Sequence, residues 1–396
     1  MVWGSAKEST FPQRDGNGLY GEISGRTVGG PIRVRQSRKT LEGEGMGITT
    51  FGANEEYADD GYPWDAVPMD SPVDEGLVQR GYGNRRSYPM LRANLRERTS
   101  QMMRRCKDAD LPYAYCKSTA LRLLGVETPE DLAGPGNAWD NAAPRKPGRQ
   151  SNRRPNADAL HVIVRKASER RTLPGVRMHV WNGLADDCVQ ILANGICCLT
   201  PAAAWASVAM DATMLQLIQI AESMERYGLA TLDELRVFVE ARRFHGKHRC
   251  RVALAIAKPG SASVKETELR VRLELRGLPE FAINFAVPGA AYDSRVEQTV
   301  DLALERYRVG LEYQGDQHRS DYRQYRRDRD KLGALAALGW RVFEVTQDDL
   351  NSEEAMDRLA MRIMCVIASQ AGGQPQITRL TYARIADPRR AGRKGV

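Results

Sequence analysis

Two acidic residues in the C-terminal third of the chain lie inside apolar stretches that have the pattern of β-strands. Asp301 stands between Val300 and Leu302, and Glu312 follows Leu311. Burying a carboxylate costs free energy unless it is paired, hydrogen-bonded or bound to a cation. A hard divalent ion between the two carboxylates would remove both this cost and their mutual repulsion. Such an ion, with Mg²⁺ as the first candidate, can orient a water molecule and stabilise charge on a scissile phosphate.

The same two acids also have a simpler interpretation. Arg308, Arg319 and Arg323 are close in the sequence and could form ordinary ion pairs with Asp301 or Glu312 at the strand ends. Spacing alone does not separate an ion-paired strand end from a metal site.

A basic and aromatic segment follows the second acid. On a helix, arginines on one face can contact phosphate groups while Tyr322 and Tyr325 face the core. The alternative is a solvated basic face, and Lys331 could instead pair with Asp328 or order the outer part of the acidic site. The residues of this segment that we expect to contact DNA are Arg319, Arg323, Arg326, Arg327 and Lys331.

Regular elements around these residues have recognisable boundaries. The pattern predicts a helix over 264–276 capped by Ser263, strands over 296–304 and 308–314, a helix over 321–338 that ends at Gly339, and a strand over 341–346. Asn351 with Glu354 is expected to cap a last helix. This order predicts a mixed sheet flanked by helices, and therefore an α/β fold for this region.

The motifs of residues 259–350 resemble, in order, those of the very-short-patch-repair-like branch of the PD-(D/E)XK nucleases. They are Pro259–Ser263, Glu266-Thr267, Val300–Leu302, Glu312–His318, Asp328 with Lys331, and Leu338–Val342. The resemblance implies a restriction-endonuclease-like core with Asp301 and Glu312 as ligands of Mg²⁺, for which Mn²⁺ can substitute. It also implies a catalytic contribution from Glu266 and a general acid or base at His318.

At two positions the sequence does not simply follow the pattern of that family. Gln314 stands where the parent motif has a catalytic lysine, and glutamine supplies no positive charge near an attacking water. Glu266 stands three residues after Ser263, which is the spacing of a capping box that needs no catalytic role. Both interpretations of Glu266 remain open at this point.

The implied function is Mg²⁺-dependent hydrolysis of DNA phosphodiester bonds, with defence against foreign DNA as a biological role. The alternative is a DNA-binding transcriptional regulator or antitoxin whose nuclease-like domain is inactive. A third interpretation is a subunit that docks on a protein partner through its N-terminal extension. Homodimerisation is common among PD-(D/E)XK enzymes and is compatible with the resemblance.

The rest of the chain divides by composition. Of the 35 glycines, 15 fall within residues 1–90, which predicts a disordered extension over 1–92. Residues 112–120 and the strand at His161 are similar to AbiEi-like N-terminal regions, which implies a winged-helix-like module. We expect that module over 93–140, a basic linker over 141–158, an α+β middle unit over 159–258, the nuclease-like domain over 259–371 and a basic tail over 372–396.

Composition restricts the remaining classes of function. The net charge of +8 permits a polyanionic partner, and the absence of an apolar run of membrane-spanning length argues against a membrane protein. The seven scattered cysteines form no C-x-x-C motif, so a disulfide framework is not expected. His161 and His179 each lie in an apolar strand, where a hydrogen-bonded structural histidine is expected. We therefore expect a protein of the cytoplasm.

Overall fold

The structure, a computed structural model, describes residues 87–132, 159–292, 296–314 and 322–390. Nearly all of the expected extension, the linker over 141–158 and the end of the basic tail lie outside these ranges. The described residues form eleven α-helices and nine strands in two mixed sheets. No helix in these ranges is long and apolar enough to cross a membrane.

The helices are α2 (Ser87–Ala109), α3 (Lys117–Leu123), α4 (Pro201–Ser207), α5 (Met214–Arg226), α6 (Leu232–Ala241), α7 (Lys247–Ile256), α8 (Val264–Glu274), α9 (Tyr322–Ala337), α10 (Gln347–Leu350), α11 (Glu353–Ala371) and α12 (Tyr382–Ile385). The strands are β1 (Ala114–Tyr115), β2 (Leu160–Val164), β3 (Val176–Val180), β4 (Val189–Ile191), β5 (Cys197–Leu199), β6 (Ala282–Tyr292), β7 (Val296–Leu304), β8 (Val309–Tyr313) and β9 (Arg341–Val345).

The N-terminal sheet has the strand order β3-β2-β1-β5-β4. Strand β1 comes from the region expected as a separate module over 93–140, yet it pairs with β2 and β5 of the expected middle unit. Side chains from both regions also share one hydrophobic core. The long α2 and the short α3 are separated by β1.

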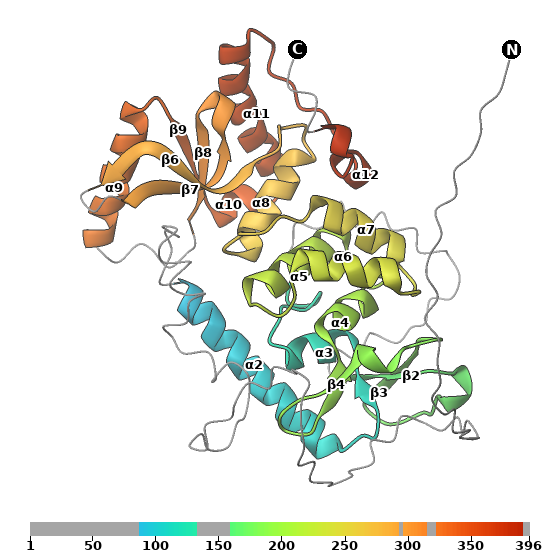
Figure 1. The fold of residues 1–396 in the computed structure, drawn as a ribbon. Coiled ribbons are helices and arrows are strands. Elements are labelled where there is room, and N and C mark those ends of the chain that lie inside the picture. Colours follow the sequence, from blue (N-terminus) through green and yellow to red (C-terminus); the bar gives the residue numbers. More distant parts are fainter. Residues whose placement is uncertain (1–86, 133–158, 293–295, 315–321, 391–396) are drawn as a thin grey trace, which may run out of the picture.

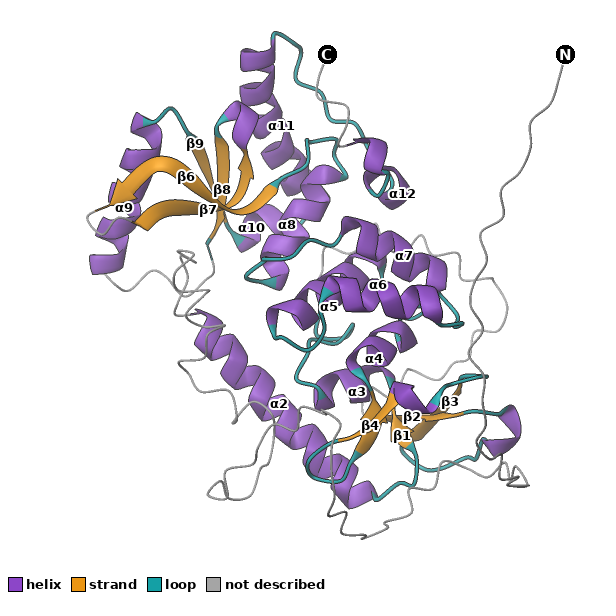
Figure 2. Ribbon diagram, in the orientation of Figure 1, coloured by secondary structure: helices purple, strands orange, loops and turns teal. Residues whose placement is uncertain are grey.

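The C-terminal sheet has the order β6-β7-β8-β9, in which β8 and β9 are parallel and the other pairs are antiparallel. One face packs against α8 and α11 through a core that includes Leu273, Leu302 and Leu359. The other face carries Val300 and packs against Leu335 of α9. Figure 2 shows this four-stranded sheet between its helices.

Most elements of this sheet agree with the sequence patterns, and two details are corrected. Strand β6 was not expected, because Pro288 and Gly289 interrupt its apolar pattern. It is the edge strand, where a residue without an N–H is tolerated. The last long helix is capped by Ser352, whose hydroxyl accepts the Ala355 N–H, and not by Asn351.

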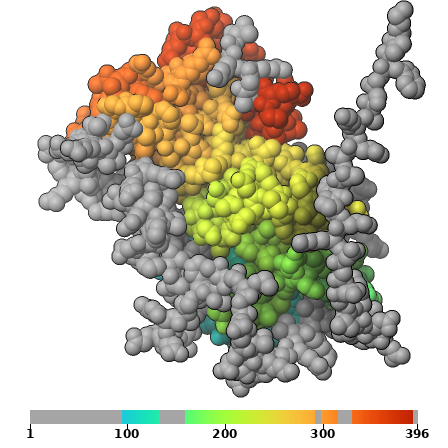
Figure 3. Space-filling view, viewed as in Figure 1, coloured from blue at the N-terminus to red at the C-terminus, as the bar shows by residue number. Residues whose placement is uncertain are grey.

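Helix α8 lies between the two halves of the protein and buries an unusual number of charged side chains. Figure 1 shows helices α4–α7 stacked between the two sheets, with α8 next to α5. Arg270 of α8 is fully buried and pairs with the buried Glu222 of α5. Glu222 also accepts the Thr267 hydroxyl and the Lys258 N–H, so its carboxylate is surrounded by donors. In the space-filling view the yellow helical layer lies directly against the orange C-terminal half (Figure 3).

The chain crosses this junction a second time after α11. Leu380 donates its N–H to the Leu275 carbonyl just after α8, and Ile385 is buried in the N-terminal core. Arg390 donates to the Leu278 carbonyl. Residues 372–390, which were expected as part of a basic tail, therefore connect the two halves.

We expect removal of one partner of the Glu222–Arg270 pair to destabilise the protein strongly. The substitution E222Q removes the close counter-charge of the buried Arg270 and leaves it only the longer contact with Glu274, at 3.7 Å, so we expect a cost of up to about 3–5 kcal/mol. E222Q/R270Q should cost less than the sum of the single substitutions, because the orphaned charge is gone. Urea unfolding measures the differences, with E240Q in the exposed Glu240–Arg251 pair as a control that should cost below about 1 kcal/mol. An effect of E222Q no larger than that of E240Q would contradict this assignment.

Candidate active site

Asp301 and Glu312 lie on the neighbouring strands β7 and β8. The paired register of the two strands ends at Leu302–Leu311, and Asp301 and Glu312 are the next residues beyond this pair. The Tyr313 N–H donates to Asp301 Oδ2 over 2.8 Å. This hydrogen bond fixes the Asp301 carboxylate at the point where the β7–β8 ladder ends.

Lys331 of α9 brings a positive charge to the same place. Its ammonium group forms an ion pair with Glu312, and each side chain is only 15% exposed. Lys331 also favours the ionised form of Asp301 electrostatically. Of the two roles weighed for this lysine, its placement supports ordering of the acidic site.

Glu266 reaches the site from the first turn of α8. Its carboxylate accepts the Ala262 N–H over 2.9 Å and the Ser263 hydroxyl over 3.0 Å, and the Ser263 hydroxyl accepts the Glu266 N–H. Ser263 therefore caps α8, but the Glu266 carboxylate accepts the Ala262 N–H in place of the Ser263 N–H, so the reciprocal bond of the expected capping box is not formed. The same buried carboxylate acts electrostatically on Asp301, so the cap also contributes negative charge to the site.

Negative charge is in excess at this site. Burial and the charge of Glu266 raise the pKa of Asp301 to about 7, against the opposing effects of the Tyr313 N–H and Lys331. Burial likewise raises the pKa of Glu266. The three carboxyl groups thus outnumber the cations that act on them, which are Lys331 and, at Glu266, the buried Arg226. A bound divalent cation would favour the ionised forms of the carboxyl groups.

The donor set fits a magnesium ion and not a structural transition-metal site. In the described part of the chain, no three side chains of His, Cys, Asp or Glu form a group that could hold a metal. Mg²⁺ does not need such a group, because it keeps several water ligands and is bound by one or two carboxylates. Asp301 and Glu312 are the residues that would hold it.

Several expected site residues are not brought into the site by the described structure. Gln314 follows β8, and its N–H donates to the Val345 carbonyl. His318 and Arg319 lie outside the described residues, as do the side chains of Arg323, Arg326 and Arg327 on α9.

Sequence reasoning missed one acid of the neighbouring strand. Glu344 of β9 is paired in register with Glu312 and is exposed. Residues paired in parallel strands point to the same face of a sheet, so the two acids share a face. The alternation of polar and apolar residues in β9 was visible in the sequence, but its register with β8 was not.

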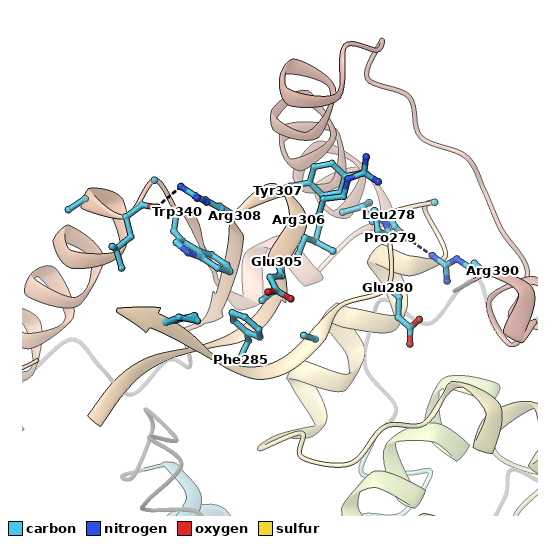
Figure 4. A pocket seen from close by; sticks show the side chains of 18 residues that line it. Leu278, Pro279, Glu280, Phe285, Glu305, Arg306, Tyr307, Arg308, Trp340 and Arg390 are labelled. Atoms are coloured by element: carbon cyan, nitrogen blue, oxygen red, sulfur yellow. Dashed lines mark hydrogen bonds between the residues drawn. The ribbon is translucent and has the colours of Figure 1, made fainter. Parts of the chain in front are cut away.

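A large hollow of about 1480 Å³ lies at the other end of the β7–β8 hairpin (Figure 4). Its walls include Phe285, Trp340 and Arg308, and it is lined by neither Asp301 nor Glu312. The acids Glu280 and Glu305 line the hollow together with Arg306, Arg308 and Arg390. We assign the candidate active site to Asp301 and Glu312 instead, because Lys331 and a raised pKa of Asp301 mark that place on the sheet.

No protein-family model, curated protein or solved structure matches this chain. The assignment of a function therefore depends on the chemistry of the site.

We expect D301N to stabilise the protein, because ionised Asp301 is unfavourable in the folded state. The ordinary aspartate pKa of 3.8 rises to about 7 on folding. The free energy of unfolding of the wild type therefore falls relative to that of D301N as the pH increases from 3.8 to about 7. At mildly alkaline pH the gain should be on the order of 4 kcal/mol and should not grow further. Thermal unfolding across this pH range measures it, with E305Q at an exposed acid as the control. A gain that is independent of pH would contradict the raised pKa.

Proposed function

We propose that this chain is a Mg²⁺-dependent DNA endonuclease that hydrolyses phosphodiester bonds. The observation that carries the proposal is the convergence of Asp301, Glu312 and Lys331 from two adjacent strands and the helix after them. Two carboxylates on a sheet, with one lysine from the helix beside it, are a suitable set for hydrolysis of a phosphodiester, in which a water attacks phosphorus and a 3′-hydroxyl leaves. Defence against foreign DNA is the biological role we attach to it.

Each residue has a definable task in this proposal. Asp301 and Glu312 would hold Mg²⁺, which would supply Lewis-acid activation of the phosphate and of a water. The Tyr313 N–H orients Asp301. Lys331 supplies the cation that Gln314 cannot provide, and its ammonium group is placed to stabilise charge that develops on the phosphate.

The arrangement of elements supports a restriction-endonuclease-like core. Apart from the unexpected edge strand β6, helix α8, strands β7 and β8, helix α9 and the parallel strand β9 follow one another in the order expected from the motifs. The finer identification of residues 93–140 as an AbiEi-like, winged-helix-like region remains part of the proposal. A homodimer and a protein partner for the N-terminal extension belong to it as well.

The second candidate function is a DNA-binding regulator or antitoxin with an inactive nuclease-like domain. The Lys331–Glu312 ion pair favours it, because a glutamate held by a lysine is less available to a metal. Footprinting on a defined operator without cleavage in Mg²⁺ or Mn²⁺ would support this alternative over the nuclease.

We expect the wild-type protein to cleave DNA in Mg²⁺ or Mn²⁺ and not in EDTA. D301N and E312Q should each lower the cleavage rate at least about 100-fold, because each removes a charged metal ligand. E305Q is the matched control, since Glu305 is an exposed acid on the same hairpin. Cleavage that survives both D301N and E312Q would eliminate the assigned site.

We expect Lys331 to matter more than Gln314. K331M should lower the single-turnover cleavage rate by about 100-fold, K331R should retain a substantial part of it, and Q314A should change it by less than about tenfold. Unfolding curves show separately whether each variant is folded. We expect D301N to be more stable than the wild type and K331M to be less stable, because K331M removes the cation beside Asp301 and Glu312. A larger loss with Q314A than with K331M would refute the role given to Lys331.

A further inference from the structure

A pair of histidines joins the strands β2 and β3 of the N-terminal sheet. His161 Nδ1 and His179 Nε2 are 2.9 Å apart, and the two rings are nearly parallel, with an interplanar angle of 7°. This distance is that of an N–H···N hydrogen bond, in which one imidazole donates and the other accepts. Each histidine was expected to have a structural hydrogen bond, and the structure shows that each is the other's partner.

The surroundings of this pair are cationic. Burial and the charges of Lys117, Arg170 and Arg177 lower the pKa of His179 to about 3. Burial and Lys117 also lower the pKa of His161. Both imidazoles are therefore neutral at physiological pH, and the positive potential comes from the three neighbouring side chains.

The acids that act on His161 already have partners of their own. They are Glu130 and Asp211. The Ser118 hydroxyl donates to Glu130 over 2.8 Å, and Lys117 forms an ion pair with Asp211. The charge of Lys117 is thus opposed by Asp211, whereas no acid is among the groups that act on His179 beside Arg170 and Arg177. The local charge is therefore not balanced within this face of the sheet.

Two of the cations remain available to a ligand. Arg170 and Arg177 are exposed, and neither has an ion pair with any residue in the described ranges. Lys117 is held in place, because its N–H donates to the Ser207 hydroxyl over 2.9 Å. Its backbone is in the left-handed region at a φ of 52°, which is a costly conformation for lysine.

We propose that His161, His179, Lys117, Arg170 and Arg177 form a phosphate-contact site for the backbone of duplex DNA. We call these five residues the histidine-pair site. Arginine guanidinium groups match phosphate oxygens in geometry and charge. A hydrogen-bonded neutral imidazole pair keeps one further ring N–H that can donate to an oxygen. The site belongs to β2, β3 and the start of α3, so it lies in the half of the protein that does not contain Asp301 and Glu312.

Other ligands fit these residues less well. A transition metal would take the two neutral imidazoles, but three cations beside them oppose its charge, and the described residues offer no third ligand of the required kind. A general acid–base pair needs its two groups on either side of a reacting atom, whereas these rings bond to each other. A polyanion, in contrast, can contact both the remaining ring N–H of the neutral histidine pair and the cationic side chains.

This inference rests on the proposed action on DNA, since it names a second contact with the same substrate. It predicts that DNA binding survives without metal and depends on residues remote from the carboxylates. Phosphate contacts fix the position of a duplex on a protein without reading its sequence. The histidine-pair site would thus hold the duplex while the C-terminal half cuts it.

The test is DNA binding by the full chain in EDTA, measured by fluorescence anisotropy of a labelled duplex at several salt concentrations. R170Q/R177Q should weaken binding about tenfold and lower the magnitude of the salt slope by about 2. R170K/R177K should recover most of the affinity. The matched control is R358Q/R362Q, which makes the same change in charge at two exposed positions of α11 and should weaken binding less than about twofold.

The outcomes separate this inference from the proposed function. Equal affinities of R170Q/R177Q and R358Q/R362Q would overturn the inference and leave the nuclease proposal intact. Normal, arginine-dependent binding without any cleavage in Mg²⁺ would overturn the nuclease proposal alone. Absence of DNA binding by the wild type would overturn both. A clear preference for duplex RNA of the same sequence, dependent on Arg170 and Arg177, would overturn the assignment to DNA.

Discussion

The buried ion pair between Glu222 and Arg270 is the constraint on which the arrangement of this protein depends. Two charges removed from water are tolerated only when their geometry is good and further donors satisfy the remaining oxygens. Glu222 meets that condition through Thr267 and the Lys258 N–H. All of these partners lie on or just before α8, so the position of α8 against α5 is specified by directional contacts as well as by apolar packing. A slip of the helix by one residue would leave buried charges without partners.

The same helix links the junction of the two halves to the chemistry of the sheet. Glu266 caps α8 through Ser263 and at the same time adds negative charge beside Asp301. Further along the helix, Arg272 pairs with Glu268 and with Glu353 of α11. The element that holds the halves together therefore also sets the protonation of a site residue. An unfavourable carboxylate is retained there, as is typical of sites where charge is kept for function at a cost in stability.

Local patterns in the sequence predicted the helices and strands around Asp301 and Glu312. They did not predict contacts between residues that are far apart in the chain. The capping residue Ser263 and the residues of β7 were predicted because caps and alternating strands leave local signals. Strand β6 was missed because Pro288 interrupts the alternating pattern of the strand. A proline is nevertheless tolerated there, since β6 is an edge strand. The ion pair of Lys331 with Glu312 and the bond between His161 and His179 depend on register and on the path of the chain. No spacing rule predicts these contacts.

Net charge illustrates the same limit. An excess of +8 is compatible with a polyanionic partner, yet it does not say which cations are available to one. The guanidinium groups of Arg270 and Arg276 are buried and paired with acids of the protein, so they stabilise the fold and cannot contact a ligand. Among the residues that the structure describes, no acid forms an ion pair with Arg170 or Arg177. The distribution of paired and unpaired cations, which only the structure reveals, therefore bears more directly on nucleic-acid binding than their number does.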